Sequence, residues 1–231
     1  MRLLTGPLRG PRDPAQPLVT LLDGPARVEL SGATAGNWAA KTANLLASLG
    51  QPARVGLLLP LHWQAVTLLL GAGLSGAAVV VGARPDDLVG CEVAFTTAGL
   101  AGEVLDAGVD DVLAVSTLPL GGRLRDLPAM VLDAGAELPV HGDHWAGRPP
   151  AHVVVERGGA PVAVPDLGLG PADRVLTALD PHAGLEVLLS ALRAGAGLVL
   201  CPGAVPSGDA LAQEGVTATA GVDLPGLRRL A

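Results

Sequence analysis

The sequence of 231 residues has little of several residue types that common protein functions require. Lysine occurs once, at Lys41, there is no tyrosine, and phenylalanine also occurs once. Charged residues make up 16% of the chain, below the usual share of about 25%, and the net charge is -7. Proteins recognise a phosphate backbone with clustered lysine and arginine. The composition therefore excludes nucleic acid as an expected partner.

Cysteine is also scarce, since only Cys91 and Cys201 are present. Each lies at the edge of an apolar run, and their positions do not match a metal-binding spacing. We expect both to be buried free thiols, which suits a reducing compartment. Residues 1–14 are too rich in proline and glycine to form a secretory signal. A cytoplasmic location is therefore expected.

A stretch without charged residues runs from Val55 to Ala83. Its length alone would allow it to cross a bilayer. Pro60 and three glycines interrupt the stretch, and each would weaken a continuous helix. A strand, a helix and a second strand describe it better, so no membrane span is expected.

Apolar runs and segments of helical periodicity alternate along the chain, which is typical of α/β proteins. A hairpin is predicted around Gly24 and Pro25, followed by a helix with Ser31 as its N-cap. Units of strand, helix and strand are predicted at residues 54–81 and 173–201. Further strands are expected at Glu92–Thr96, Asp111–Val115, Met130–Leu132, His152–Glu156 and Val216–Ala220. We predict an α/β fold with two-lobed αβα layers of mainly parallel sheet.

Many prolines and glycines lie in residues 138–150, which are interpreted as a connecting loop. This loop divides a single domain, residues 1–231, into predicted subdomains 19–140 and 151–231. An internal similarity supports two related lobes, because Arg54 precedes His62 by the spacing at which Arg174 precedes His182. Every parallel βαβ unit shares this kind of pattern, so chance remains the alternative.

Two local patterns suggest ligand sites and also have structural interpretations. Gly71, Gly73 and Gly76 match the dinucleotide fingerprint, but that motif requires a strand before it and a helix after it. These glycines end a predicted helix and are interpreted as structural. In the connecting loop, His141, Asp143 and His144 could ligate a metal. No fourth ligand follows at a regular spacing, so no metal site is predicted. Trp145 is interpreted as an anchor for this loop.

Polar residues at strand ends are the candidates for a ligand crevice. Asp180, Pro181 and His182 follow a predicted strand, at the edge where open parallel sheets place ligands. His182 has a second interpretation, in which it caps the next helix or binds a backbone carbonyl. Thr96 and Thr97 end another strand and offer hydroxyl donors. The chain has no Gly-x-Ser-x-Gly elbow, CxxC pair or Walker loop.

The order of the elements resembles the opening of acyl-CoA synthetases and other adenylate-forming enzymes. The segments that carry the likeness are RVELS (27–31), RVGLLLP (54–60), LLLGAGLSGAAVVV (68–81), DRVLTALDPHAG (173–184), AGAGLVLCP (194–202) and EGVTATAGVD (214–223). They cover most of residues 19–224. The resemblance implies the fold of the front part of the large domain of those enzymes, in truncated form.

The departures from that family concern its catalytic residues. Where the family has a Ser/Thr/Gly-rich loop ending in Pro-Lys that holds the ATP phosphates, this chain has VERGGAP (155–161). Arg157, Gly158 and Gly159 form a degenerate phosphate loop without hydroxyl or lysine donors. The family's Tyr-Gly-x-Thr-Glu motif, ribose-binding aspartate and catalytic lysine have no counterpart here. Only His182 matches a site residue, the histidine that lines the family's acyl pocket.

Two hypotheses follow from the resemblance and its departures. The first is a non-catalytic relative, a pseudoenzyme without catalytic residues or a cofactor, that acts as a binding or regulatory protein with a small-molecule crevice near Thr97 and His182. The second is an enzyme of acyl or nucleotide chemistry that needs a complementary partner subunit, or one with an unrelated activity in the same crevice. A homodimer is expected, because strand edges left exposed invite pairing. The alternative is a monomer whose loops cover those edges.

Overall fold

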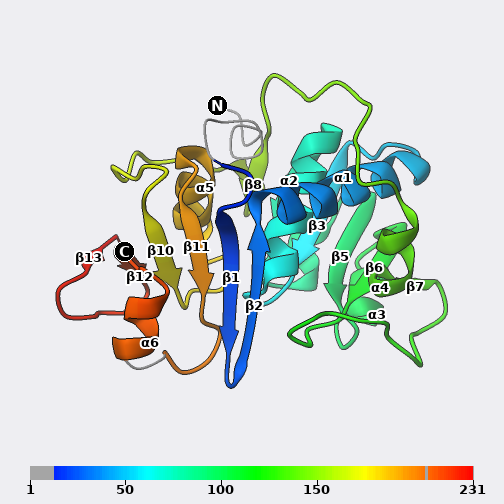
Figure 1. Cartoon of the computed structure of the whole chain (residues 1–231). Helices are drawn as coiled ribbons and strands as arrows, with labels where there is room; N and C mark the ends of the chain where they lie inside the picture. The colour runs from blue at the N-terminus through cyan, green and yellow to red at the C-terminus, as the bar shows by residue number, and fades with distance from the viewer. Residues whose placement is uncertain (1–12, 206–207, 231) are drawn as a thin grey trace.

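A computed structural model describes residues 13–205 and 208–230 of the chain. Within these residues the strands form two sheets, which we call the larger sheet and the smaller sheet. Figure 1 shows the smaller sheet on the left and the larger sheet on the right. The expected α/β class with mainly parallel sheets is confirmed.

The described chain opens with an antiparallel hairpin of β1 (Pro17–Asp23) and β2 (Ala26–Ser31). Gly24 in its turn has a φ of 56°, in the left-handed region that glycine adopts without strain. The side chain of Ser31 then accepts a hydrogen bond of 3.2 Å from the backbone N–H of Thr34 and caps α1 (Gly32–Ser48). The predicted hairpin and N-cap are both confirmed.

The larger sheet has the order β7–β6–β5–β3–β4–β8–β9 among the described residues, and only β8 and β9 are antiparallel neighbours. Its strands are β3 (Arg54–Leu58), β4 (Ala78–Val81), β5 (Val93–Thr97), β6 (Asp111–Val115), β7 (Val131–Asp133), β8 (Val155–Arg157) and β9 (Ala160–Pro161). Its associated helices are α2 (Trp63–Ser75), α3 (Ala101–Asp106) and α4 (Ala134–Glu137), with 3₁₀ turns at Pro85–Leu88 and Leu138–Val140. The predicted unit at residues 54–81 is confirmed as β3, α2 and β4.

The smaller sheet has the order β13–β12–β10–β11–β1–β2 in the described part of the chain. Its remaining strands are β10 (Arg174–Thr177), β11 (Gly197–Leu200), β12 (Ala218–Ala220) and β13 (Arg228–Arg229), and its helices are α5 (Leu185–Ala194) and α6 (Gly208–Gln213). The predicted unit at residues 173–201 is confirmed as β10, α5 and β11. The short strand β13 after the predicted last strand was not foreseen.

Side chains of the central strands alternate between different cores. In β3, Val55 and Leu57 face a central core that also contains residues of α1, α2 and α5. Leu58 faces a second core beneath α3, on the outer side of the larger sheet. In the smaller sheet, Val175 faces the central core, whereas Leu176 faces a third core that includes a residue of α6. Both sheets are therefore covered on both faces, which explains their nearly continuous apolar strands.

Strands of the two sheets do not separate at the predicted connecting loop. β8 and β9 follow residues 138–150 but pair with the larger sheet, whereas β1 and β2 precede the loop and pair with the smaller sheet. Pairing depends on which strand edge is available in space, and a composition pattern does not record this. The chain therefore crosses between the two sheets more often than the predicted subdomains 19–140 and 151–231 imply.

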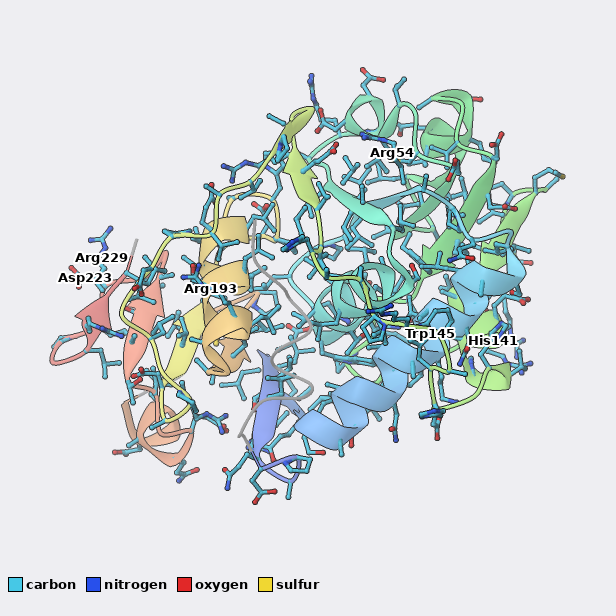
Figure 2. The ribbon with its side chains drawn as sticks, turned by 90° about the horizontal axis from the view of Figure 1, so that it is seen from above. Arg54, His141, Trp145, Arg193, Asp223 and Arg229 are labelled. Carbon is cyan, nitrogen blue, oxygen red and sulfur yellow. The ribbon has the colours of Figure 1, made fainter. Side chains whose placement is uncertain are left out.

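After β9, an irregular segment lies along α5. The guanidinium of Arg193 donates hydrogen bonds of 2.9 and 2.7 Å to the carbonyls of Val164 and Pro165. The hydroxyl of Ser190 donates a third bond, of 2.8 Å, to Pro165. Figure 2 shows Arg193 on this helix.

In the part of the chain that the structure describes, no helix combines the length and the apolar surface needed to cross a bilayer.

Candidate functional site

The degenerate phosphate loop folds as a tight β-hairpin. Arg157 and Ala160 face each other in the β8–β9 pairing, which leaves Gly158 and Gly159 as the turn. These glycines have φ values of 58° and 77°. A two-residue turn with positive φ at both positions matches the twist of a hairpin, and it favours a Gly-Gly pair. The sequence therefore specifies a tight turn here.

The cationic group of this hairpin is already bound within the protein. The Arg157 guanidinium donates two hydrogen bonds to the carboxylate of Glu186, one of them 2.8 Å long, and a further bond of 3.0 Å to the carbonyl of His182. Burial opposes ionisation of Glu186, but the hydrogen bonds and the charge of Arg157, together with a backbone N–H, outweigh it and hold the pKa of this carboxyl below its ordinary value. The pair is a bidentate, charge-assisted contact, the strongest kind that arginine makes.

Asp180 and His182 lie in the turn between β10 and α5. The Asp180 carboxylate accepts hydrogen bonds of 3.0 and 2.9 Å from the backbone N–H groups of His182 and Ala183. This is the local bonding by which aspartate starts a turn. Asp180 thus shapes the turn before α5, and His182 supplies its carbonyl to Arg157. The structure brings together Arg157, Asp180 and His182 of the predicted site residues.

Thr96 and Thr97 lie elsewhere, at the carboxyl end of β5. Three strand spacings separate β5 from β8, which corresponds to about 14 Å across the sheet. Thr96 is fully buried, and its hydroxyl has no hydrogen-bond partner among the described residues. In the same part of the chain no hydrogen bond joins either threonine to His182. The predicted crevice residues therefore occupy separate places: Thr96 and Thr97 end a strand of the larger sheet, whereas Asp180 and His182 follow a strand of the smaller sheet.

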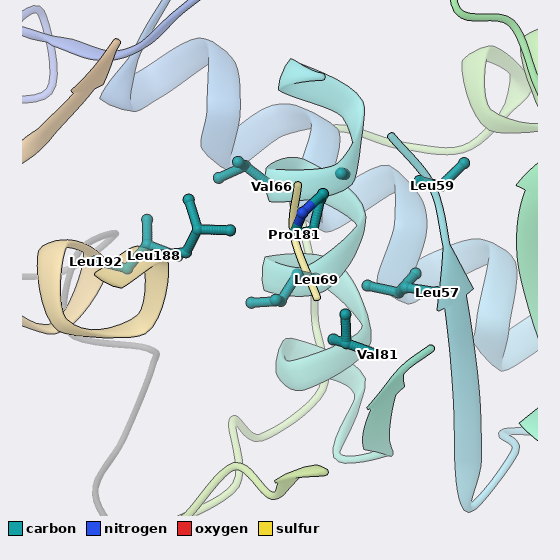
Figure 3. Close-up of a pocket in the computed structure, with 9 residues that line it drawn as sticks. Leu57, Leu59, Val66, Leu69, Val81, Pro181, Leu188 and Leu192 are labelled. Atoms are coloured by element: carbon teal, nitrogen blue, oxygen red, sulfur yellow. The ribbon is translucent and has the colours of Figure 1, made fainter. Parts of the chain in front are cut away.

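The space between α2, α5 and the larger sheet is almost completely filled. A cavity of about 10 Å³ remains, lined by Leu57, Val66, Leu69, Val81, Pro181 and Leu188 among other apolar residues. Figure 3 shows these side chains converging from α2, α5, β3, β4 and, for Pro181, the turn before α5. A cavity of this volume is barely large enough for one water molecule, and its lining offers almost no polar partner. It cannot hold an acyl group or a nucleotide without a rearrangement.

A larger groove lies outside the core, beside the β8–β9 hairpin. It has a volume of about 420 Å³ and is lined by residues that include Arg157, Ala160, Pro161 and Glu186. Its two charged groups are those that pair with each other. The charges of Arg157 and Glu186 therefore neutralise each other at the groove, and the other lining residues are mostly apolar.

Two further polar residues at the start of α2 were not predicted as site residues. The ring of His62 accepts a hydrogen bond of 3.3 Å from the backbone N–H of Gln64 and caps the helix. Burial lowers the pKa of His62, and the Gln64 side-chain oxygen is buried without a partner in the described chain. The sequence signal was the position of His62 after Pro60, between a strand and a helix, which is where N-caps occur.

Glycines of the dinucleotide-like pattern lie in α2 and at its end, as the structural interpretation requires. A Cβ atom at Gly71 would lie 2.3 Å from Cβ of Thr42 on α1, and one at Gly73 would lie 2.8 Å from Val153. Gly76 ends the helix with a φ of 98°. These glycines allow close packing and helix termination. No strand leads into a helix N-terminus at this motif.

The histidines of the connecting loop lie in a segment that α1 holds in place. Lys41 donates to the carbonyl of His141 at 2.7 Å and forms an ion pair of 2.5 Å with Asp143. Asn44 binds the carbonyl of His144. Trp145 packs against the central core, and Figure 2 shows it beside α1. No cluster of three potential metal ligands occurs among residues 13–205 and 208–230.

The fold is that of adenylate-forming enzymes. The structure of an acyl-CoA synthetase from Brucella canis matches 96% of this chain and 47% of its own length, with a TM-score of 0.76 and 18% identity. The anthranilate CoA ligase AuaEII, solved in complex with anthranoyl-AMP, matches 94% of this chain and 49% of its own, with a TM-score of 0.70 and 17% identity. The chain thus spans about half the length of these enzymes, and the likeness establishes its fold.

No model of a known protein family matches the sequence. A curated protein does: the "TIGR03089 family protein" of Mycobacterium tuberculosis (strain ATCC 25618 / H37Rv) is 33% identical over 213 residues. The match covers 81% of this chain and 83% of that protein. With this degree of identity over most of both proteins, the chain belongs to the TIGR03089 family.

Proposed function

We propose that this protein is a non-catalytic relative of acyl-CoA synthetases that acts as a binding or regulatory protein in the cytoplasm. It does not activate carboxylic acids with ATP, and it requires no cofactor. The observation that carries this proposal is the pairing of Arg157 with Glu186. The cation of the hairpin at residues 155–161 is neutralised by a carboxylate of the same chain.

Charge and hydrogen-bond donors support this reading. Phosphates bind where backbone N–H groups combine with cations or hydroxyl donors. The segment at residues 155–161 has Arg157 as its one cation and contains no hydroxyl side chain. Lys41, the single lysine of the sequence, is bound to the loop at residues 141–143. A triphosphate at this hairpin would therefore have to compete with Glu186 for Arg157.

The central cavity also supports the proposal. An acyl pocket between α2 and α5 would need space for a carboxylic acid, whereas the cavity there has a volume of about 10 Å³. Pro181, which precedes the family-like His182, is one of the residues that fill it. Opening this space would expose leucines and valines to water. The cost would be about 25 cal/mol for each Å² of apolar surface exposed.

The test is an assay of the purified protein for exchange of pyrophosphate into ATP in the presence of carboxylic acids. An active acyl-CoA synthetase serves as the positive control. We expect no exchange above the level without protein, and calorimetric titration with ATP should give no micromolar affinity. Exchange that requires both ATP and an acid would refute the proposal. A thermal-shift screen with nucleotides, CoA and carboxylic acids then searches for the ligand of a binding protein.

A second candidate function is an enzyme that is completed by another polypeptide. The groove of about 420 Å³ beside Arg157 and Glu186 favours it, because the groove is open and has charged groups at its wall. In such a complex, the partner would supply the catalytic lysine and the nucleotide contacts. This candidate predicts that pyrophosphate exchange appears when a co-purified partner is added to the otherwise inactive chain.

A further inference from the structure

One long edge strand of the smaller sheet is open in the described structure. β2 ends the strand order of this sheet and pairs only with β1 within residues 13–205 and 208–230. Its opposite edge therefore carries backbone N–H and C=O groups that have no strand to bind. An edge of this kind is a template for pairing with another chain.

The backbone groups that point outward belong to Arg27 and Glu29. In an antiparallel pair, alternate residues of a strand exchange hydrogen bonds with the partner, and the others turn both backbone groups away. The two-residue turn pairs Asp23 with Ala26 as the closing, hydrogen-bonded pair. By alternation, Val28 and Leu30 also exchange backbone hydrogen bonds with β1. The backbone groups of Arg27 and Glu29 therefore face outward, away from β1. The bond of 2.9 Å from Gly32 N–H to the Gln16 carbonyl fits this alternation at the other end of the hairpin.

Side chains along the same strand have a self-complementary charge pattern. Arg27 and Glu29 lie on one face and flank Val28, and their side chains are 50% and 33% exposed. If two copies of β2 pair in antiparallel orientation with Val28 at the centre, each Arg27 faces Glu29 of the second copy. Residues with outward backbone groups then also face one another, so the charge register and the hydrogen-bond register coincide.

We propose that the protein forms a two-fold dimer by antiparallel pairing of β2 with β2 of a second copy, centred on Val28. The two smaller sheets become one continuous sheet. Opposite charges placed across strands stabilise a sheet by about 0.2 to 1 kcal/mol for each pair, and the two-fold axis creates this pair twice. Val28 is half-buried against the central core, and the second Val28 would cover its remaining exposed surface.

Existing contacts on this face are compatible with such a dimer. Glu214 accepts hydrogen bonds of 2.6 and 3.1 Å from Arg27, and Glu29 accepts a bond from the same guanidinium. These contacts hold the Arg27 guanidinium between Glu29 of its own strand and Glu214. A fixed side chain loses less conformational entropy when a further carboxylate approaches it.

The test is light scattering after size exclusion at low micromolar concentration. We expect the native protein to have the mass of two chains. Glu29→Arg places like charges across the axis but leaves the bonds from Arg27 to Glu214 in place, so this variant should have the mass of one chain. The charge-swapped variant combines Arg27→Glu and Glu29→Arg with Glu214→Gln, because a carboxylate at position 27 would otherwise lie beside that of Glu214. It restores opposite charges across the axis and should regain the mass of two chains.

Asp143→Arg provides a matched control, because it also reverses a charge and removes one ion pair, that with Lys41, but lies outside β2. This variant should remain a dimer. Thermal unfolding confirms that each variant is folded. A one-chain mass for the native protein, or a two-chain mass for Glu29→Arg, overturns the proposed interface. If the charge-swapped variant is folded and stays at one chain, the register centred on Val28 is refuted. None of these outcomes depends on whether the protein is catalytic.

Discussion

The guanidinium of Arg157 and the carboxylate of Glu186 form a two-bond contact that joins the β8–β9 hairpin to the first turn of α5. β8 belongs to the larger sheet, whereas α5 packs on β11 of the smaller sheet. The contact therefore links the two halves of the fold. The side chains of Arg157 and Glu186 are 31% and 35% exposed, so water screens the ion pair only in part.

Replacing Glu186 should destabilise the protein modestly. The variant Glu186→Gln keeps the shape of the side chain and removes its charge, which weakens the bidentate contact with Arg157. We expect a loss of about 1 kcal/mol in the free energy of unfolding at pH 7, measured by urea denaturation. The control is Glu103→Gln on α3, an exposed residue, for which we expect less than about 0.5 kcal/mol. Equal losses in the two variants would contradict a specific role for the pair.

The same variant has a defined dependence on pH. The pKa of Glu186 in the folded protein lies below its ordinary value, because burial, which raises it, is outweighed by the bonds and charge of Arg157 together with a backbone N–H. The unfolded chain therefore binds more protons as the pH falls through this range, and the native protein loses stability. The difference in unfolding free energy between the native protein and Glu186→Gln should be full at pH 7 and should shrink below about pH 4. A difference that is unchanged at pH 3 would argue against this linkage.

Close packing of α1 on α2 depends on Gly71. A Cβ atom there would lie 2.3 Å from Cβ of Thr42 and 2.7 Å from the carbonyl oxygen of Ala39. Because the nearest atoms are backbone and a branched side chain, they cannot move aside independently. Gly71→Ala should lower the free energy of unfolding by about 2 kcal/mol or more, as measured by denaturant titration.

Gly102 provides the matched control for this substitution. It lies in helix α3, and a Cβ atom built there meets nothing within 4 Å. Since alanine favours a helix more than glycine does, Gly102→Ala should be neutral or stabilising by up to about 1 kcal/mol. A similar loss of stability in both variants would mean that the α1–α2 contact is looser than described.

Much of the fold could be predicted from the sequence because its signals are local. Gly24 and Pro25 identified the hairpin, and Ser31 identified the start of α1. The two units of strand, helix and strand were visible as apolar runs separated by helical periodicity. Resemblance to adenylate-forming enzymes then gave the order of the elements. All of these features depend on residues that are near one another in the chain.

The parts that could not be predicted depend on contacts between distant residues. Arg157 was a candidate because of its loop, but Glu186 gave no signal, since an acidic residue in the first turn of a helix is common. The assignment of β8 to the larger sheet likewise depends on a free edge beside β4. His182 and Thr97 were grouped because both follow strands, although they follow strands of different sheets.

Glu214 should contribute more to stability than any exposed acidic residue. Its side chain is 7% exposed, and it accepts hydrogen bonds from Arg27 and Arg174. Glu214→Ala would leave two arginines beside a buried surface without their carboxylate, which should cost about 3 kcal/mol in urea denaturation. The control is Asp223→Ala, because Asp223 is 82% exposed and lies 3.9 Å from Arg229. That variant should change stability by less than about 0.5 kcal/mol, and a comparable loss in both would contradict the distinction.

The reaction of each cysteine with a thiol reagent reports whether the outer core that contains it is open. Cys91 is buried beneath α3 in the outer core of the larger sheet, and Cys201 is buried in the outer core of the smaller sheet. Burial raises the pKa of each thiol to about 11, so almost no thiolate is present at pH 8. The native protein should therefore not react with a thiol reagent at this pH. The unfolded protein, with thiols near their ordinary pKa, should react at both positions.

The raised pKa values also set the direction of the alkaline response. Below the ordinary thiol pKa of about 8.5 both states keep the proton, and the stabilising effect of the buried thiols is complete. As the pH rises toward 11, the unfolded state loses protons first, and the folded state becomes less stable.

The single variants Cys91→Ala and Cys201→Ala assign the labelling to one position each. Because the thiols lie in different cores, different labelling rates in moderate urea would show that one outer layer opens before the other. Rapid labelling of either thiol in the native protein would contradict the packing of its core.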